Sequence, residues 1–154
     1  NNPGASPVTW RLPEMDFVHA TLWPSGWGPP KRLEEALVLY DRECSRYGKP
    51  YLGGEFGGHW GGSAPRVMER DLHSGLWRTL TLNAGGTPMF WWWNFLHNRD
   101  LYFEFRALAR FLEGEDLRGP ERVSRTEHAF AENATLEAYS FGDSAWRILW
   151  VADP

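Results

Sequence analysis

The residue with the clearest capacity for chemistry in this sequence is Glu55, a carboxylate that stands between two pairs of glycines at the end of a short apolar run. The surrounding segment, residues 50–58, reads PYLGGEFGG. Tyr51 and Leu52 indicate a buried strand, and flanking glycines let other groups approach the backbone closely. We therefore predict that Glu55 is a reactive group at the end of a strand. The alternative is a structural carboxylate in a glycine-rich turn.

Aromatic side chains are the second candidate for chemistry. They make up 16% of the 154 residues and include 10 Trp, whereas a domain of this size holds on average only about two or three Trp. Tryptophan packs well in protein cores, and its flat face also stacks on sugar rings while its N–H donates a hydrogen bond. Composition by itself leaves both roles open.

Charge narrows the choice of partners. The formal net charge is -4, and the sequence pI is near 5.7. Because no run of Lys or Arg is present to neutralise phosphates, we expect no nucleic-acid partner. We also expect no membrane partner, since no stretch reaches the roughly eighteen apolar residues of a membrane span. A neutral substrate fits this composition better.

Cys44 is the single cysteine of the chain. One cysteine excludes an intramolecular disulfide and a multi-cysteine metal site. We expect Cys44 to be a small buried hydrophobe on a helix, and we predict neither a metal nor a cofactor.

The elements that must position Glu55 follow from apolar periodicity, which predicts three strand–helix pairs. The expected strands span residues 15–22, 51–55 and 87–94, and the expected helices span residues 33–47, 65–83 and 101–112. Strands that alternate with helices pair in parallel, so this part of the chain is predicted to be α/β.

The chain changes character after Gly114. Residues 115–127 form a charged, turn-rich link. Two shorter runs, residues 135–141 and 145–151, then indicate a hairpin around Gly142 and Asp143. We interpret this segment as the start of a small antiparallel β module with too few strands to bury a core of its own.

Three βα units form either a small open sheet or part of a (β/α)8 barrel. Polar and aromatic side chains lie at the C-terminal end of each expected strand: His19 and Trp23 at the first, Glu55 and His59 at the second, and Trp91 to Asn94 at the third. Barrel enzymes build their sites at the carboxyl ends of the strands, so this distribution favours the barrel. No G-x-G-x-x-G loop opens a helix, which counts against a nucleotide-binding sheet.

Three segments together resemble a known family: KPYLGGEFG (49–57), DLHSGLWR (71–78) and AGGTPMFWWW (84–93). They are similar to the seventh strand, seventh helix and eighth strand of the clan A retaining glycoside hydrolases, in particular the cellulase-like relatives of family 5 that carry a C-terminal β domain. The resemblance covers residues 16–117. It implies that residues 1–117 are the last three βα units of a (β/α)8 TIM barrel and that residues 118–154 begin a β domain.

The resemblance also implies a function. Glu55 would be the nucleophile, a Trp among residues 91–93 would line a sugar subsite, and the parent protein would hydrolyse a β-linked polysaccharide or oligosaccharide after secretion or export to the periplasm. The family's acid/base is a glutamate that follows an asparagine on the fourth strand, and this sequence contains no Asn-Glu pair. We therefore expect part of a longer enzyme that is inactive alone.

The second carboxylate has five candidates, namely Glu14, Asp16, Asp71, Asp100 and Glu104. The first two precede their strand, at the wrong end of the sheet, while Asp71 and Glu104 lie on predicted helices, where solvated or capping roles are expected. Asp100 lies in a loop at the carboxyl end of the strands and stays open as a candidate.

Glu55 must remain ionised in an aromatic pocket, so it needs hydrogen-bond donors nearby. His19, His59 and indole N–H groups are the expected donors. Successive strand side chains alternate, so either Trp91 and Trp93 or Trp92 faces inward. The predicted substrate-binding set is His19, Trp23, His59, Trp60, Trp91, Trp92, Trp93 and Asn94, with Trp27 as a further candidate.

Two other functions stay open. The chain could be a carbohydrate-binding module that uses exposed aromatic side chains without chemistry. It could also be a half-barrel that covers its sheet edges by assembling with a second copy or with a complementing N-terminal barrel segment.

Overall fold

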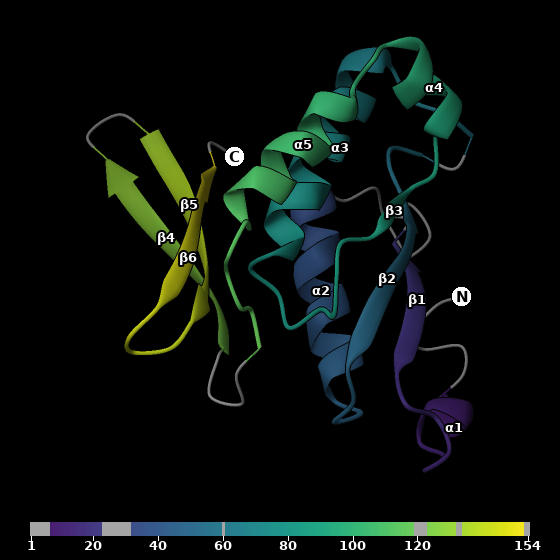
Figure 1. Cartoon of the computed structure of the whole chain (residues 1–154), viewed down its shortest axis with the longest axis vertical. Coiled ribbons are helices and arrows are strands. Elements are labelled where there is room, and N and C mark those ends of the chain that lie inside the picture. The colour runs from purple at the N-terminus through teal and green to yellow at the C-terminus, as the bar shows by residue number, and fades with distance from the viewer. Residues whose placement is uncertain (1–6, 23–31, 60, 119–122, 132–133, 153–154) are drawn as a thin grey trace.

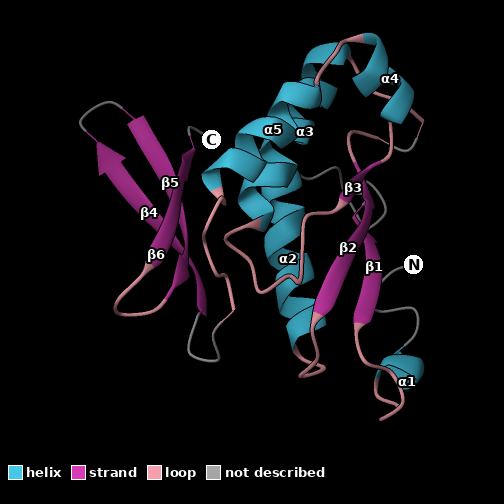
Figure 2. Cartoon of the chain, in the orientation of Figure 1, coloured by secondary structure: helices cyan, strands magenta, loops and turns pink. Residues whose placement is uncertain are grey.

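The computed structural model describes residues 7–22, 32–59, 61–118, 123–131 and 134–152. The described chain is mixed α/β, with a three-stranded parallel sheet and a three-stranded antiparallel sheet (Figures 1 and 2). In chain order the elements are α1 (Pro7–Trp10), β1 (Val18–Leu22), α2 (Leu33–Ser45), β2 (Tyr51–Phe56), α3 (Pro65–Thr79), β3 (Met89–Phe90), α4 (Trp93–Asn98), α5 (Tyr102–Phe111), β4 (Val123–Ala131), β5 (Ala134–Gly142) and β6 (Arg147–Ala152).

The parallel sheet has the order β1-β2-β3, so neighbours in sequence are neighbours in space. A helix follows each strand, and Figure 1 shows that α2, α3 and α5 lie together on one side of the sheet. The predicted alternation of strands and helices with parallel pairing is confirmed. We call the opposite side of the β1–β3 sheet the open face, because none of the described helices packs on it.

The core lies between this sheet and its helices. Leu37, Tyr40 and Cys44 recur at helical spacing along α2 and are buried, as are Leu72 and Leu76 of α3. The expectation that Cys44 is a buried hydrophobe is confirmed.

The Tyr40 hydroxyl lies 2.6 Å from the carbonyl oxygen of Leu52 and 3.1 Å from that of Ala20. Helix α2 thereby contacts the backbones of both β1 and β2. Burial raises the pKa of Tyr40, so this hydroxyl keeps the proton that it donates.

The ladder between β1 and β2 has an irregularity just before Phe56. Ala20 lies opposite Gly53 and Leu22 lies opposite Phe56, so one residue of β1 faces two residues of β2, Gly54 and Glu55. An extra residue of this kind shifts the phase of side-chain alternation, as in a β-bulge. Tyr51 and Phe56 therefore both face the helices although they are an odd number of positions apart.

Helix α3 accommodates Phe56 through a glycine. A Cβ atom on Gly75 would lie 2.0 Å from Cε2 of the Phe56 ring. Glycine in a helix interior is normally unfavourable, and here it provides the space that the ring fills.

Several expected boundaries are wrong. The first strand was expected from residue 15, but β1 begins at Val18. The third parallel strand was expected over residues 87–94, but β3 contains only Met89 and Phe90, and α4 begins at Trp93. Helix α3 ends at Thr79 rather than before Ala84, and Ala84 instead forms an isolated bridge with Tyr51. Consecutive apolar residues do not distinguish a buried strand from a strand that passes directly into a helix.

The C-terminal sheet is larger than the predicted hairpin. The hairpin is confirmed as β5 and β6, joined at Gly142 and Asp143. The interpretation of residues 115–127 as a turn-rich link is wrong in its second half, because β4 begins at Val123 and pairs antiparallel with β5 along its whole length. Charged residues interrupt the apolar pattern there, so the strand signal in the sequence is weak.

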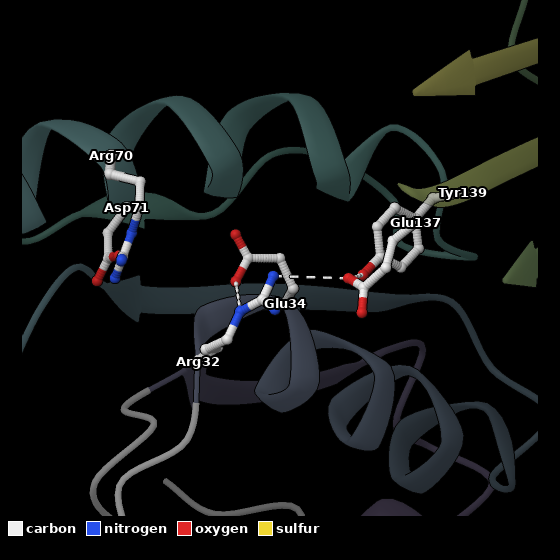
Figure 3. A network of polar contacts seen from close by, with 6 residues as sticks. All are labelled: Arg32, Glu34, Arg70, Asp71, Glu137 and Tyr139. Atoms are coloured by element: carbon white, nitrogen blue, oxygen red, sulfur yellow. Dashed lines mark hydrogen bonds and ion pairs between the residues drawn. The ribbon is translucent and has the colours of Figure 1, made fainter. Parts of the chain in front are cut away.

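A polar network joins the antiparallel sheet to α2 (Figure 3). Arg32, just before α2, forms ion pairs with Glu34 at 3.6 Å and with Glu137 of β5 at 3.5 Å. Glu137 also accepts a hydrogen bond from the Tyr139 hydroxyl.

Arg78 of α3 contacts the ring of the same tyrosine. Its guanidinium carbon lies 3.8 Å from the centre of the Tyr139 ring, and the residue is only 1% exposed. Burial lowers the pKa of Arg78 to about 10.

Candidate functional site

Glu55 is the second-last residue of β2, at the carboxyl end of the strand. In a regular strand it would share the side of Tyr51 and Gly53 and would point into the helices. The irregularity at Gly54 and Glu55 reverses this placement, and Phe56 takes the helix side instead. The half-buried Glu55 therefore belongs to the open face. Its ladder partner Met89, which shares that face, is 57% exposed.

His19 contributes to the same face beside Glu55. Its register partner is Leu52, and its Nε2 atom lies 2.8 Å from the position that a Cβ atom of Gly54 would occupy. The imidazole ring therefore lies against the Gly54 backbone, next to Glu55 in sequence. His19 was expected at the C-terminal end of the first strand, but it is the second residue of β1. Its long side chain and the missing Cβ of Gly54 bring the ring towards the carboxyl end of β2.

The open face is apolar around these two polar side chains. Leu52, Met89 and Trp91 are all exposed. The Trp91 N–H donates to the Phe56 carbonyl at 2.9 Å, which continues the ladder past β3 by one residue. Alternation then puts Trp91 on the side of Met89. The open face thus combines a carboxylate, an imidazole and a set of aromatic and aliphatic groups.

One peptide group in the loop after β2 is bonded from two directions. The carbonyl oxygen of Gly57 accepts a hydrogen bond from Trp92 Nε1 at 2.8 Å. The N–H of Gly58, in the same peptide group, donates to Asp71 Oδ2 at 2.9 Å. The β3–α4 connection and helix α3 therefore hold this loop jointly, two residues beyond Glu55.

Asp71 is a buried carboxylate, 4% exposed, in the middle of α3. Burial raises its pKa, while the Gly58 N–H and the Arg70 guanidinium act in the opposite direction and Glu34 of α2 adds to the increase. The expectation of a solvated or capping role for Asp71 is wrong. Sequence spacing offered a signal, because Asp71 shares the buried helix side with Met68 and Gly75 at intervals of three and four.

His59 is exposed and bonded within its own loop. Its N–H donates to Ser63 Oγ at 2.9 Å, and its Nδ1 atom accepts the Gly61 N–H at 3.0 Å. Trp23, Trp27 and Trp60 lie outside the described residues, so their predicted sugar contacts stay predictions.

The three consecutive tryptophans occupy different environments. The Trp92 indole N–H donates its hydrogen bond to the carbonyl oxygen of Gly57, and Trp92 directly precedes the first residue of α4. Trp93 is 71% exposed and lines a cavity of about 570 Å³ on the β3 side of α4 and α5, together with Leu96 and Phe105. Asn94 is exposed, and its Oδ1 accepts the Phe95 N–H in the first turn of α4.

Two of the proposed partners of Glu55 bond to other groups. Glu104 of α5 contacts His73 of α3 at 2.9 Å, and Asp71 bonds to Gly58. Asp100 has a φ of 52° in the turn between α4 and α5. Glu14 and Asp16 are exposed and precede β1, as expected.

The carboxylate of Glu55 forms no hydrogen bond or ion pair with the described residues, including the expected donors His19 and His59. No group of three or more potential metal ligands occurs in the described part of the chain. None of the described helices combines the length and the apolar character that crossing a membrane requires. Comparisons with protein-family models, curated proteins and solved structures find no match to this chain.

Proposed function

We propose that residues 1–117 are the last three βα units of a (β/α)8 barrel in a retaining glycoside hydrolase, and that Glu55 is its nucleophile. The substrate is a β-linked polysaccharide or oligosaccharide. Residues 118–154 belong to the accompanying β domain.

The placement of Glu55 carries the proposal. Helices α2, α3 and α5 lie on one side of the parallel sheet, as in a barrel wall, whereas a doubly wound sheet has helices on both sides. Glu55 lies on the other side at the carboxyl end of its strand, which corresponds to the inside of a barrel at its active end. His19 and Trp91 accompany it there.

The proposed reaction uses two carboxyl groups about 5 to 5.5 Å apart. One oxygen of Glu55 bonds to the anomeric carbon while the glycosidic C–O bond breaks, and an acid gives a proton to the leaving oxygen. A water molecule then attacks the anomeric carbon, returns a proton to that acid and releases the Glu55 carboxylate. Trp91 offers an aromatic face for the sugar ring.

In this proposal the acid/base comes from outside this chain, and two of the candidates within it, Glu104 and Asp71, bond to other groups. The chain alone therefore does not turn over β-glucan or β-mannan. Robust hydrolysis of either polymer by the wild type, abolished by Glu55→Gln, would contradict the missing acid/base.

A nucleophile can be tested without its acid. A 2-deoxy-2-fluoro-β-cellobioside with a dinitrophenolate leaving group needs no protonation of that group, so attack by Glu55 would leave a stable glycosyl ester. Peptide mapping by mass spectrometry is expected to find the label on Glu55, and no label in Glu55→Gln. Glu69→Gln, a change at a half-buried residue of α3 that pairs with Arg99 rather than with Glu55 or Asp71, serves as the control that keeps the label. Labelling at another residue, or none, would contradict the role of Glu55.

The exposure of the open face favours a second candidate function. In it the chain is a half-barrel that binds carbohydrate only after it assembles with a second copy or with a complementing N-terminal barrel segment. Parallel sheets are normally covered on both sides, yet Leu52, Met89 and Trp91 are exposed on this one. A light-scattering mass above that of the monomer would support assembly between copies. Oligosaccharide binding that is lost in Trp91→Ala and unchanged in Glu55→Gln would favour binding without chemistry.

A further inference from the structure

We propose that Asp71 is a positioning residue of the Glu55 site, and that it acts with Trp92 by fixing the peptide group between Gly57 and Gly58. This inference rests on the proposed function. It assigns a role to a buried carboxylate that the proposed reaction itself does not use.

The geometry is that of a clamp on one peptide group. Trp92 Nε1 donates to the carbonyl oxygen at 2.8 Å, and Asp71 Oδ2 accepts from the N–H at 2.9 Å. Both φ angles at this point are positive, 117° for Gly57 and 60° for Gly58, a conformation that favours glycine. The clamp therefore holds a backbone turn that other residues adopt only with strain.

The turn lies between Glu55 and His59. It is the only covalent connection from β2 to the loop that carries His59, so its orientation determines where that loop leaves the open face. Side chains that contact a substrate must be held to within a fraction of an ångström, which requires support from a second layer of residues. Asp71 and Trp92 supply this support from two different elements.

Asp71 is buried and has two charged residues as neighbours. Its neighbours are Arg70, 3.1 Å away on the same helix, and Glu34, which faces it from α2 (Figure 3). The Gly58 N–H and the Arg70 guanidinium compensate the buried carboxylate of Asp71, and an apolar residue here would leave the Gly58 N–H without its acceptor. The bond to the Gly58 N–H is the feature that an apolar residue would not provide.

Two Asp71 variants distinguish the effect of the hydrogen bond to the Gly58 N–H from the effect of the negative charge of Asp71. Asp71→Asn keeps an oxygen acceptor for the Gly58 N–H, whereas Asp71→Ala removes it. Trp92→Phe keeps the aromatic ring and removes the donor to Gly57, and it also identifies the Trp92 indole signal in a ¹⁵N–¹H spectrum as the one that disappears. Glu69→Gln, two positions away on α3, is the matched control.

The first measurement is solvent exchange of the Trp92 indole N–H in the full chain. Asp71→Ala is expected to speed this exchange by about threefold to tenfold, which corresponds to the loss of one hydrogen bond. Asp71→Asn and Glu69→Gln are expected to leave it within about twofold. Unchanged exchange in Asp71→Ala would overturn the clamp.

The second measurement is the affinity for cellohexaose and mannohexaose by calorimetry. Asp71→Ala is expected to weaken binding about tenfold, with recovery in Asp71→Asn. Faster indole exchange without any change in affinity would overturn the positioning role and leave only a structural one. Absence of oligosaccharide binding by the wild type would contradict the proposed function. The exchange measurement needs no ligand, so it still tests the clamp in that case, and the failure of one proposal can be told from the failure of the other.

Discussion

Tyr51 and Phe56 lie on the same side of β2 although they are an odd number of positions apart. Tyr51 donates a hydrogen bond to Asp41 of α2, and Phe56 packs on Gly75 of α3. This arrangement requires the extra residue at Gly54 and Glu55, which exchanges the side to which every later residue of the strand points. The same irregularity turns Glu55 away from the helices, so packing and the candidate site depend on one local feature.

Gly75→Ala tests the packing of Phe56. Alanine in a helix interior usually stabilises by about 1 kcal/mol relative to glycine, but here its Cβ would lie 2.0 Å from the Phe56 ring. We expect a net destabilisation of about 1 to 3 kcal/mol from overpacking, measured by urea unfolding. Gly86→Ala, with no atom within 4 Å of the added Cβ, is expected to be nearly neutral, and Phe56→Leu should relieve the Gly75→Ala defect. A more stable Gly75→Ala variant would contradict this packing.

The raised pKa of Asp71 predicts that the stability of the folded protein depends on pH. Burial raises its pKa above the ordinary value of 3.8, so between the two values the folded protein holds more protons than the unfolded chain. The contribution of Asp71 to stability is therefore fully present below the ordinary value and is lost as the pH rises through the raised one. Asp71→Asn does not ionise and should flatten this part of the profile. Urea midpoints from about pH 4 upward measure the effect, and a parallel profile in Asp71→Asn would count against it.

The contact between Arg78 and Tyr139 joins α3 to the antiparallel sheet. A desolvated cation over an aromatic face contributes about 2 kcal/mol, and the guanidinium carbon lies 3.8 Å from the ring centre. A double-mutant cycle with Arg78→Met and Tyr139→Leu is expected to give a coupling energy of about 1 to 2 kcal/mol. Tyr139→Phe keeps the ring and should retain most of the coupling. Additive effects of the two substitutions would show that the contact contributes nothing.

Cys44 should be unreactive in the folded protein. Burial raises the pKa of its thiol to about 12, and the thiolate is the form that reacts with disulfide reagents. At about pH 8 we expect labelling by a disulfide reagent to proceed only at the rate of unfolding, and to become immediate in denaturant. A Cys44→Ala, Ser45→Cys double variant moves the thiol to an exposed position and should react at once. Immediate labelling of native Cys44 would contradict its burial.

Local sequence predicted the elements that surround the candidate site. Leu33, Leu37, Tyr40 and Cys44 recur at helical spacing and form the buried side of α2, and the strand predicted at residues 51–55 forms β2 together with Phe56. The parallel order followed from the alternation of strands and helices, because a helix must return the chain before the next parallel strand begins. Periodicity was less informative at residues 91–93, where three tryptophans fit a strand, a turn or a helix start equally well.

The sequence by itself determined that Glu55 stands at the end of a strand among glycines and that the first sheet is parallel with helical connections. It did not determine the side to which Glu55 points, because that depends on one extra residue in the pairing of β1 with β2. Nor did it reveal that Asp71 and Trp92 bond to the same peptide group, since these residues come from separate elements. Local patterns specify how a segment folds, whereas register and long-range hydrogen bonds exist only once the segments pack together.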